Sequence, residues 1–153
     1  EELDLSWNEL AVLPPAVLTI PDLKVLCVEG NALTELPHPL ARLAALHTLN
    51  IGCNKITAPP PDFASCAALR TLVWSANGLP DIPAPVFQLT GLTTLDVGDN
   101  KLPCCPDGLA SLVNLTFLNL HGNAITNLPN DVIGKLVKLT HLKVSRNQLV
   151  ALP

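Results

Sequence analysis

Asparagine recurs along the whole chain at an almost constant interval. The steps between successive members are 23 residues five times and 24 residues once, and the members are Asn8, Asn31, Asn54, Asn77, Asn100, Asn123 and Asn147. A proline follows each asparagine by six residues, at Pro14, Pro37, Pro60, Pro83, Pro106, Pro129 and Pro153. A fixed period of this length is typical of repeat proteins, in which each repeat is one unit stacked on the next. The pattern predicts a solenoid of seven repeats.

Apolar residues recur at the same positions along the repeats. Counted from the first leucine, such as Leu23 or Leu46, they stand at positions 1, 4, 6, 11, 14, 18 and 21, with Asn at 9 and Pro at 15. Positions 4 and 6 have the spacing that places side chains on one face of a β-strand. They predict one short strand per repeat, paired in parallel with its neighbours over a shared core. Positions 18 and 21 are three residues apart, which favours a short helical turn.

The asparagine at position 9 follows the strand, where the chain turns inward. Its side-chain amide both donates and accepts hydrogen bonds, so it can satisfy backbone groups of its own turn and of the next repeat. We expect these side chains to stack into an asparagine ladder formed by Asn31, Asn54, Asn77, Asn100 and Asn123. The proline at position 15 fixes φ and lacks an N–H group, which suits extended or 3₁₀ backbone outside a sheet. The convex side is therefore expected to hold little regular helix.

A single domain of residues 1–153 is predicted, divided into repeats 1–22, 23–45, 46–68, 69–91, 92–114, 115–138 and 139–153. The sixth repeat carries one extra residue between Val132 and Leu136. The first repeat lacks its opening leucine, and the last stops at Pro153 before its return limb. Solenoids need polar caps over their end repeats, whereas Leu3 and Leu149 continue the core pattern at the two ends. We therefore expect the chain to be a fragment of a larger protein, or its ends to be covered by partner subunits.

The combined pattern LxxLxLxxNxLxxLPxxLxxL resembles the leucine-rich repeat superfamily. Its 23-residue LxxLP form resembles the intracellular, Ras-associated subgroup, which includes Scribble, Erbin and the repeat arrays of Roco proteins. The segments LTTLDVGDNKL at 92–102 and LTFLNLHGNAI at 115–125 match closely. The resemblance implies an α/β leucine-rich repeat solenoid, a right-handed curved superhelix with a concave parallel sheet and a convex side of loops and 3₁₀ turns. It also implies protein partners on the concave face, often small GTPases or phosphatases.

Two residues depart from this pattern. Pro59 and Cys105 stand at position 14, where the family has leucine. Both substitutions weaken the apolar column at that position without threatening the fold.

Composition and charge exclude several other classes of protein. Apolar residues make up 48% of the chain and charged residues 14%, which provides a core and excludes disorder by composition. Pro, Asn or Gly interrupts every apolar run, so no membrane span is expected. The net charge of −4 argues against a nucleic-acid partner, which favours a basic surface. The five cysteines form no terminal cluster, and their odd number predicts reduced thiols in a cytosolic or nuclear compartment. Of the two, we expect the cytoplasm.

Outward positions on the strands and the residues just after them form the predicted concave face and its rim. Acidic side chains such as Glu2 and Glu29 give way along the repeats to small neutral ones and then to polar and basic ones. This gradient would orient a partner of complementary charge, although any solvated face also needs charges. The candidate partner-binding residues are Thr71, Val73, Thr94, Asp96, Phe117, Asn119, His121, His141, Lys143 and Arg146.

Phe117 is the strongest single candidate on this face. Large rigid side chains are favoured at the energetic centres of interfaces, and this one points outward from its strand. The alternative is that Phe117 packs on its neighbours. Trp7, at position 8 of the first repeat, has the same two interpretations. Trp74 and Phe63 occupy positions 6 and 18, so we expect both in the core.

No cofactor, metal site or catalytic group is predicted. Cys104 and Cys105 are adjacent, so their side chains diverge, and no CxxC pair is present. Cys27 and Cys53 lie three positions apart on neighbouring repeats, roughly 10 Å, which is too far for a disulfide. We expect these two to be the exposed, reactive thiols. The four histidines lack a convincing nucleophile partner, and there is no phosphate-binding glycine loop.

These observations predict a protein-interaction scaffold that is not an enzyme. It would bind a partner protein on its concave face, with a small GTPase or a phosphatase as the partner class implied by the resemblance. One alternative is a structural subunit of a large assembly. Another is the regulatory repeat arm of a larger enzyme such as a kinase or cyclase.

Overall fold

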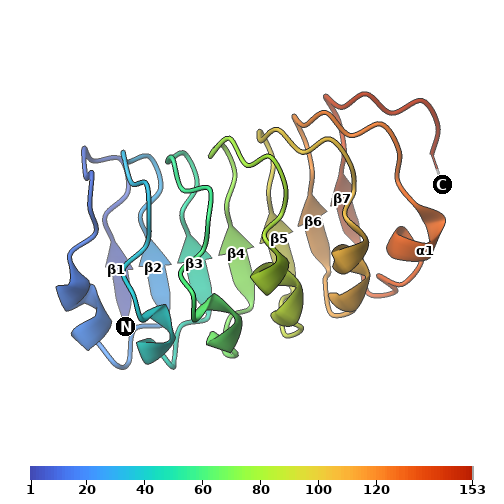
Figure 1. Cartoon of the computed structure of the whole chain (residues 1–153). Helices are drawn as coiled ribbons and strands as arrows, with labels where there is room; N and C mark the ends of the chain where they lie inside the picture. The colour runs from blue at the N-terminus through green and yellow to red at the C-terminus, as the bar shows by residue number, and fades with distance from the viewer. Residues whose placement is uncertain (153) are drawn as a thin grey trace.

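Seven short parallel strands form one sheet in the computed structural model, which describes residues 1–152. The strands follow one another in chain order (Figure 1). They are β1 (Glu2–Asp4), β2 (Val25–Cys27), β3 (Thr48–Asn50), β4 (Thr71–Val73), β5 (Thr94–Asp96), β6 (Phe117–Asn119) and β7 (His141–Lys143). Each strand pairs with the next in matched register, so that Leu49 lies between Leu26 and Leu72. The sheet is curved and unclosed, which confirms the predicted solenoid; Pro153 lies outside the described residues.

Short turns and extended segments cover the side of the core opposite the sheet (Figure 1). Within residues 1–152 the 3₁₀ turns are η1 (Pro15–Thr19), η2 (Leu40–Arg42), η3 (Phe63–Ser65), η4 (Ala84–Gln88) and η5 (Asp107–Ser111). The proline at position 15 directly precedes the turn in four repeats, at Pro14, Pro83, Pro106 and Pro129. In the second and third repeats the turn begins later, after Pro39 and Asp62. The expected convex side of loops and 3₁₀ turns is confirmed.

The extra residue of the sixth repeat produces one α-helical turn, α1 (Asn130–Ile133). Its N–H groups bond four residues back, from Ile133 to Pro129 at 3.0 Å and from Gly134 to Asn130 at 2.8 Å. In a 23-residue repeat the turn closes over three residues, as from Val86 to Pro83 at 2.9 Å. The added residue supplies the length that an α-helical ring requires.

A continuous apolar core lies between the sheet and the turns. Trp74 is fully buried at position 6, and its ring meets that of Phe63 edge to face with 5.9 Å between centroids. The indole N–H donates to the carbonyl of Ile56 at 2.8 Å, so the polar atom of this side chain is satisfied. Both aromatic residues are in the core, as predicted. Of the two departures at position 14, Cys105 is buried and fills the column, whereas Pro59 is half-buried.

The position-9 asparagines form a ladder between neighbouring repeats. The amide of Asn54 donates to Gly52 of its own turn at 2.9 Å and to Val28 of the preceding repeat, also at 2.9 Å. Its side-chain oxygen accepts from the N–H of Leu33, again in the preceding repeat, at 3.0 Å. The same contacts recur at Asn31, Asn77, Asn100 and Asn123. The sequence predicted that these side chains bond to the next repeat, and this prediction is wrong. Each turn points its asparagine toward the preceding repeat.

Candidate binding face

The outward side chains of the strands align in two rows along the concave sheet. Register between strands sets these rows, because residues at equal positions lie side by side. Over β4 to β7 one row runs Thr71, Thr94, Phe117 and His141, and the other runs Val73, Asp96, Asn119 and Lys143. The structure therefore brings eight of the ten candidate residues onto one continuous surface. His121 and Arg146 lie just after β6 and β7, at the rim of the same surface.

Phe117 packs on its neighbours and keeps part of its ring exposed. Its ring is half-buried and lies 6.2 Å from the His141 ring, tilted by 34°. Lys143 Nζ sits 5.3 Å from the Phe117 ring centroid, within the range of a cation–π contact. The aromatic side chain thus packs on its neighbours on β7 and still keeps part of its face open. Together these three residues form a platform on β6 and β7.

Asp96 and Asn119 are held in place by each other. The Asn119 amide donates to both carboxylate oxygens of Asp96 at 3.0 Å. The same Asp96 carboxylate accepts the N–H of Gly98 at 2.9 Å, and the Asn119 oxygen accepts the N–H of His121 at 3.0 Å. These bonds fix the ends of β5 and β6. A partner would therefore meet a preorganised polar pair beside the platform.

The β7 end of the face carries exposed cations. Neither Lys143 nor Arg146 lies within salt-bridge distance of a carboxylate in the part of the chain that the structure describes. His121 bridges two repeats, because Nδ1 lies 2.7 Å from the Ser145 hydroxyl and Nε2 lies 3.8 Å from an Asp99 carboxylate oxygen. Positive charge at this end is consequently available to an outside anion.

The opposite end of the concave face is acidic. Glu29 is half-buried and accepts a hydrogen bond from the Asn50 amide at 2.9 Å. The pKa of Asp4 lies below its usual value because the side chain and the N–H of Ser6 bond to it. Trp7 is 71% exposed at this end, and its ring lies so close to Gly30 that a Cβ there would stand 2.5 Å from it. The absence of a side chain at Gly30 in the second repeat therefore leaves room for the Trp7 ring.

Two family models match the chain. Residues 67–125 match one described as Leucine rich repeat, and residues 45–66 match another described as Leucine Rich Repeat. The two matched segments are contiguous and contain β4, β5 and β6 together with much of β3's repeat. The chain is a leucine-rich repeat protein.

Solved structures of other proteins resemble this one over nearly its whole length. A leucine-rich repeat protein of Leptospira interrogans is 33% identical with a TM-score of 0.87, covering 100% of this chain and 45% of that one. An internalin from Listeria monocytogenes is 31% identical with a TM-score of 0.85, covering 98% and 43%. The ectodomain of the Arabidopsis thaliana receptor kinase GASSHO1/SCHENGEN3, solved with CASPARIAN STRIP INTEGRITY FACTOR 2, is 32% identical with a TM-score of 0.80, covering 97% and 18%. The chain therefore spans less than half the length of each of these three proteins. No curated protein sequence matches it significantly.

The thiols of this leucine-rich repeat protein differ from expectation. Cys104 is exposed, whereas Cys27 and Cys53 are half-buried. Burial raises the pKa of Cys27, and the nearby carboxylates of Asp4, Glu2 and Glu29 raise it further; burial and then Glu29 do the same for Cys53. The prediction that Cys27 and Cys53 are the exposed, reactive pair is wrong, because the neighbouring repeats cover part of each side chain.

A second feature of the repeats escaped the sequence pattern. Position 8 adopts a left-handed backbone conformation in every repeat, with φ between 51° and 68°. The residues at this position are Trp7, Gly30, Cys53, Ala76, Asp99, Gly122 and Arg146. Only two are glycine, the residue that favours this conformation. The residue types at position 8 therefore did not indicate a left-handed backbone. The shared requirement is the turn that places the asparagine at position 9.

The described residues contain neither a cluster of metal ligands nor a membrane-spanning helix. Within residues 1–152 no three His, Cys, Asp or Glu side chains converge closely enough to hold a metal ion. None of the helices in this described range has the length and apolar character needed to cross a membrane.

Proposed function

We propose that this leucine-rich repeat protein is an interaction module without catalytic chemistry, which binds a partner protein on the concave face over β4 to β7. The platform of Phe117, His141 and Lys143 carries the proposal. It offers a partly open aromatic ring beside an unpaired cation, and aromatic and basic side chains are enriched at the energetic centres of interfaces. Thr71 and Thr94 next to it are small, so a partner can approach the sheet closely.

Charge supports one orientation of the partner. The basic end at Lys143 and Arg146 would receive an acidic surface, and the end near Asp4 and Glu29 would receive a basic one. Such complementarity acts mainly on the rate of association and on specificity. A small GTPase or a phosphatase is the first partner class to test, because the LxxLP repeats resemble the Ras-associated subgroup. The five free cysteines favour a reducing compartment such as the cytoplasm.

Affinity capture with three versions of the chain tests the proposal. The concave variant combines Phe117→Ala, Lys143→Glu and Arg146→Glu. The control variant combines Val137→Ala, Lys135→Glu and Lys138→Glu, which changes the charge equally at exposed positions outside the two concave rows. Thermal unfolding of each version checks that the fold is intact.

The expected result is a set of proteins captured by wild type and by the control variant but lost by the concave variant. Purified members of that set should bind the concave variant about tenfold or more weakly, since loss of one central anchor costs over 1.4 kcal/mol. If the folded concave variant captures the same proteins as wild type, the concave face is not the binding surface. If the control variant alone loses them, the partner binds elsewhere on the solenoid.

A further inference from the structure

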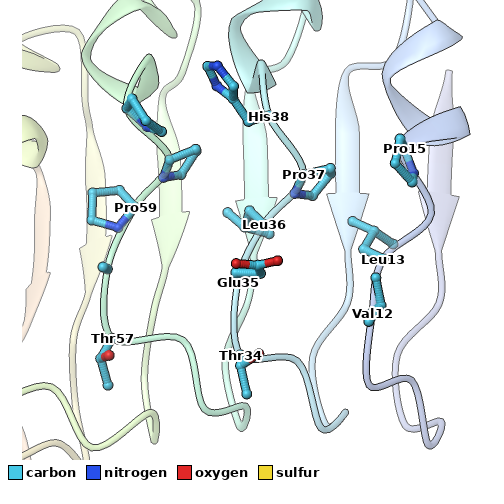
Figure 2. Close-up of a pocket in the computed structure, with 13 residues that line it drawn as sticks. Val12, Leu13, Pro15, Thr34, Glu35, Leu36, Pro37, His38, Thr57 and Pro59 are labelled. Atoms are coloured by element: carbon cyan, nitrogen blue, oxygen red, sulfur yellow. The ribbon is translucent and has the colours of Figure 1, made fainter.

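A groove of about 470 Å³ crosses the flank of the first three repeats, after the asparagine ladder and before the 3₁₀ turns. Three extended limbs line it, residues 12–15, 34–38 and 57–61, which run side by side in Figure 2. These limbs lie after the position-9 asparagines and so outside the two concave rows. The groove is therefore a surface separate from the proposed binding face. Its volume lies within the usual range of ligand-binding clefts.

The groove has an apolar floor that follows from the sequence of the limbs. Leu13 and Leu36 occupy position 14 and are buried, and Pro60 beside them is buried too. In the third repeat Pro59 replaces the leucine of that position and stays half-buried. A proline ring is more compact than a leucine side chain and cannot swing toward the core. This departure places a short, partly exposed apolar group in the wall of the groove.

Backbone groups in the walls are free to bond with something else. Within residues 1–152, the N–H groups of Glu35, Leu36 and Thr57 donate no hydrogen bond to the protein. The prolines at 37, 59, 60 and 61 cannot donate to a β-ladder, so they keep the three limbs from pairing with one another as strands. Extended limbs with unpaired amides are the feature that an extended peptide recognises by main-chain hydrogen bonds.

One lone charge marks the groove. Glu35 lies in the central limb, exposed and without an ion-pair partner among the described residues. The nearby imidazole of His38 is already engaged, since its Nδ1 lies 2.7 Å from the Asp62 carboxylate. An unpaired carboxylate above an apolar floor suits an arginine side chain, whose stem packs on apolar groups while its guanidinium bonds to the carboxylate.

We propose that this flank groove binds an extended peptide segment of a partner protein, with an arginine of that segment on Glu35. Main-chain groups of the peptide bond to the free amides of the limbs, and its apolar side chains rest on Leu13, Leu36 and Pro60. Binding in the groove would add a second contact for a partner protein that also binds the concave face. The two surfaces share no residue, so the proposal for the groove and the proposal for the concave face can be tested and refuted separately.

Amide chemical-shift mapping by nuclear magnetic resonance tests the proposal with a defined probe. The probe is the capped pentapeptide Thr-Val-Arg-Val-Thr, and its matched control carries Glu in place of Arg. Glu35→Lys removes the charge partner. Asp81→Lys is the control variant, because Asp81 is an exposed acid at the same position of the fourth repeat, outside the groove.

The expected result is that the arginine peptide shifts the amides of Val12, Glu35, Leu36 and Thr57. Glu35→Lys should weaken its binding by about tenfold, as expected for a lost charged hydrogen bond, while Asp81→Lys leaves it unchanged. The glutamate peptide should shift none of these amides. Three outcomes would overturn the proposal: shifts confined to the concave strands, equal affinity for Glu35→Lys, or equal binding of capped arginine alone, which would show a site for a small organic cation. No shifts at millimolar peptide would overturn it as well.

Discussion

The side-chain oxygen of Asn77 accepts a hydrogen bond from the backbone N–H of Ile56 at 2.7 Å, and its amide donates to the carbonyl of Ile51 at 3.0 Å. Both backbone groups belong to the preceding repeat, and all three residues are buried. One side chain therefore satisfies two backbone groups that lie between strand and return limb. Each repeat depends on the following one to complete its hydrogen bonding.

Removing such a side chain from the middle of the stack should be costly. Asn77→Ala leaves a buried N–H and a buried carbonyl unpaired, and we expect it to lower the free energy of unfolding by roughly 2–4 kcal/mol. Asn8 is exposed and bonds only within its own turn, so Asn8→Ala should cost less than about 1 kcal/mol. Urea unfolding of the two variants measures the difference. Equal losses would contradict a stabilising role for contacts between repeats.

The left-handed position 8 predicts a stabilising substitution. Ala76 has φ of 51°, a conformation that costs a residue with a Cβ about 1–2 kcal/mol. Ala76→Gly removes this strain and loses part of the gain through the greater freedom of glycine in the unfolded chain, so a net gain of about 0.5–1 kcal/mol is expected. Ala64→Gly, in η3, serves as the control and should destabilise. A loss of stability at both positions would argue against strain at Ala76.

Thiol labelling should follow exposure and pKa. Burial raises the pKa of Cys66 and of Cys105 to about 11 in each case, with smaller additions from Asp62 and Cys104 respectively. Only a thiolate reacts quickly, so these two should be labelled last and exposed Cys104 first. Limited N-ethylmaleimide treatment followed by peptide mass spectrometry gives the order. In urea the five thiols should react at similar rates, and early labelling of Cys66 in the folded protein would contradict its burial.

Acid should weaken one contact on the convex side. Burial alone would raise the pKa of Asp62, but hydrogen bonds from the Ala41 N–H and from His38 outweigh it and lower the pKa. With the unfolded-state value near 3.9, the carboxylate stabilises the fold above that pH, and the contribution is lost as pH falls through the lower folded-state pKa. Wild type should therefore be more stable than Asp62→Asn near neutral pH, and the gap should close well below pH ~4.

Urea unfolding of both proteins at several pH values measures that gap. Asp22→Asn is the matched control, because Asp22 is exposed. The difference in stability between wild type and Asp22→Asn should stay small at every pH. A gap for Asp62→Asn that widens as the pH falls would contradict the inferred direction of the shift.

Much of the fold could be predicted from the sequence because each repeat has the same spacing of apolar residues. Leu49 and Ile51 are two residues apart, which places both side chains on one face of a strand, and Leu72 and Trp74 repeat this spacing 23 residues later. Parallel pairing of the strands in matched register is the arrangement that buries all four side chains. The extra residue of the sixth repeat was also visible in the sequence. The order of the candidate rows on the concave face follows from the same register, while their role in binding remains a prediction.

What the sequence determined by itself was periodicity: which residues face inward, where the chain turns, and how many units stack. The tertiary structure decided what depends on the neighbouring repeat. It set the direction in which Asn77 bonds, the partial cover over Cys27, the contact of Lys143 with Phe117, and the groove left beside Pro59. The physical reason is that these contacts join residues more than twenty positions apart, or depend on the handedness of a turn, and neither property is written in a local pattern of apolar and polar residues.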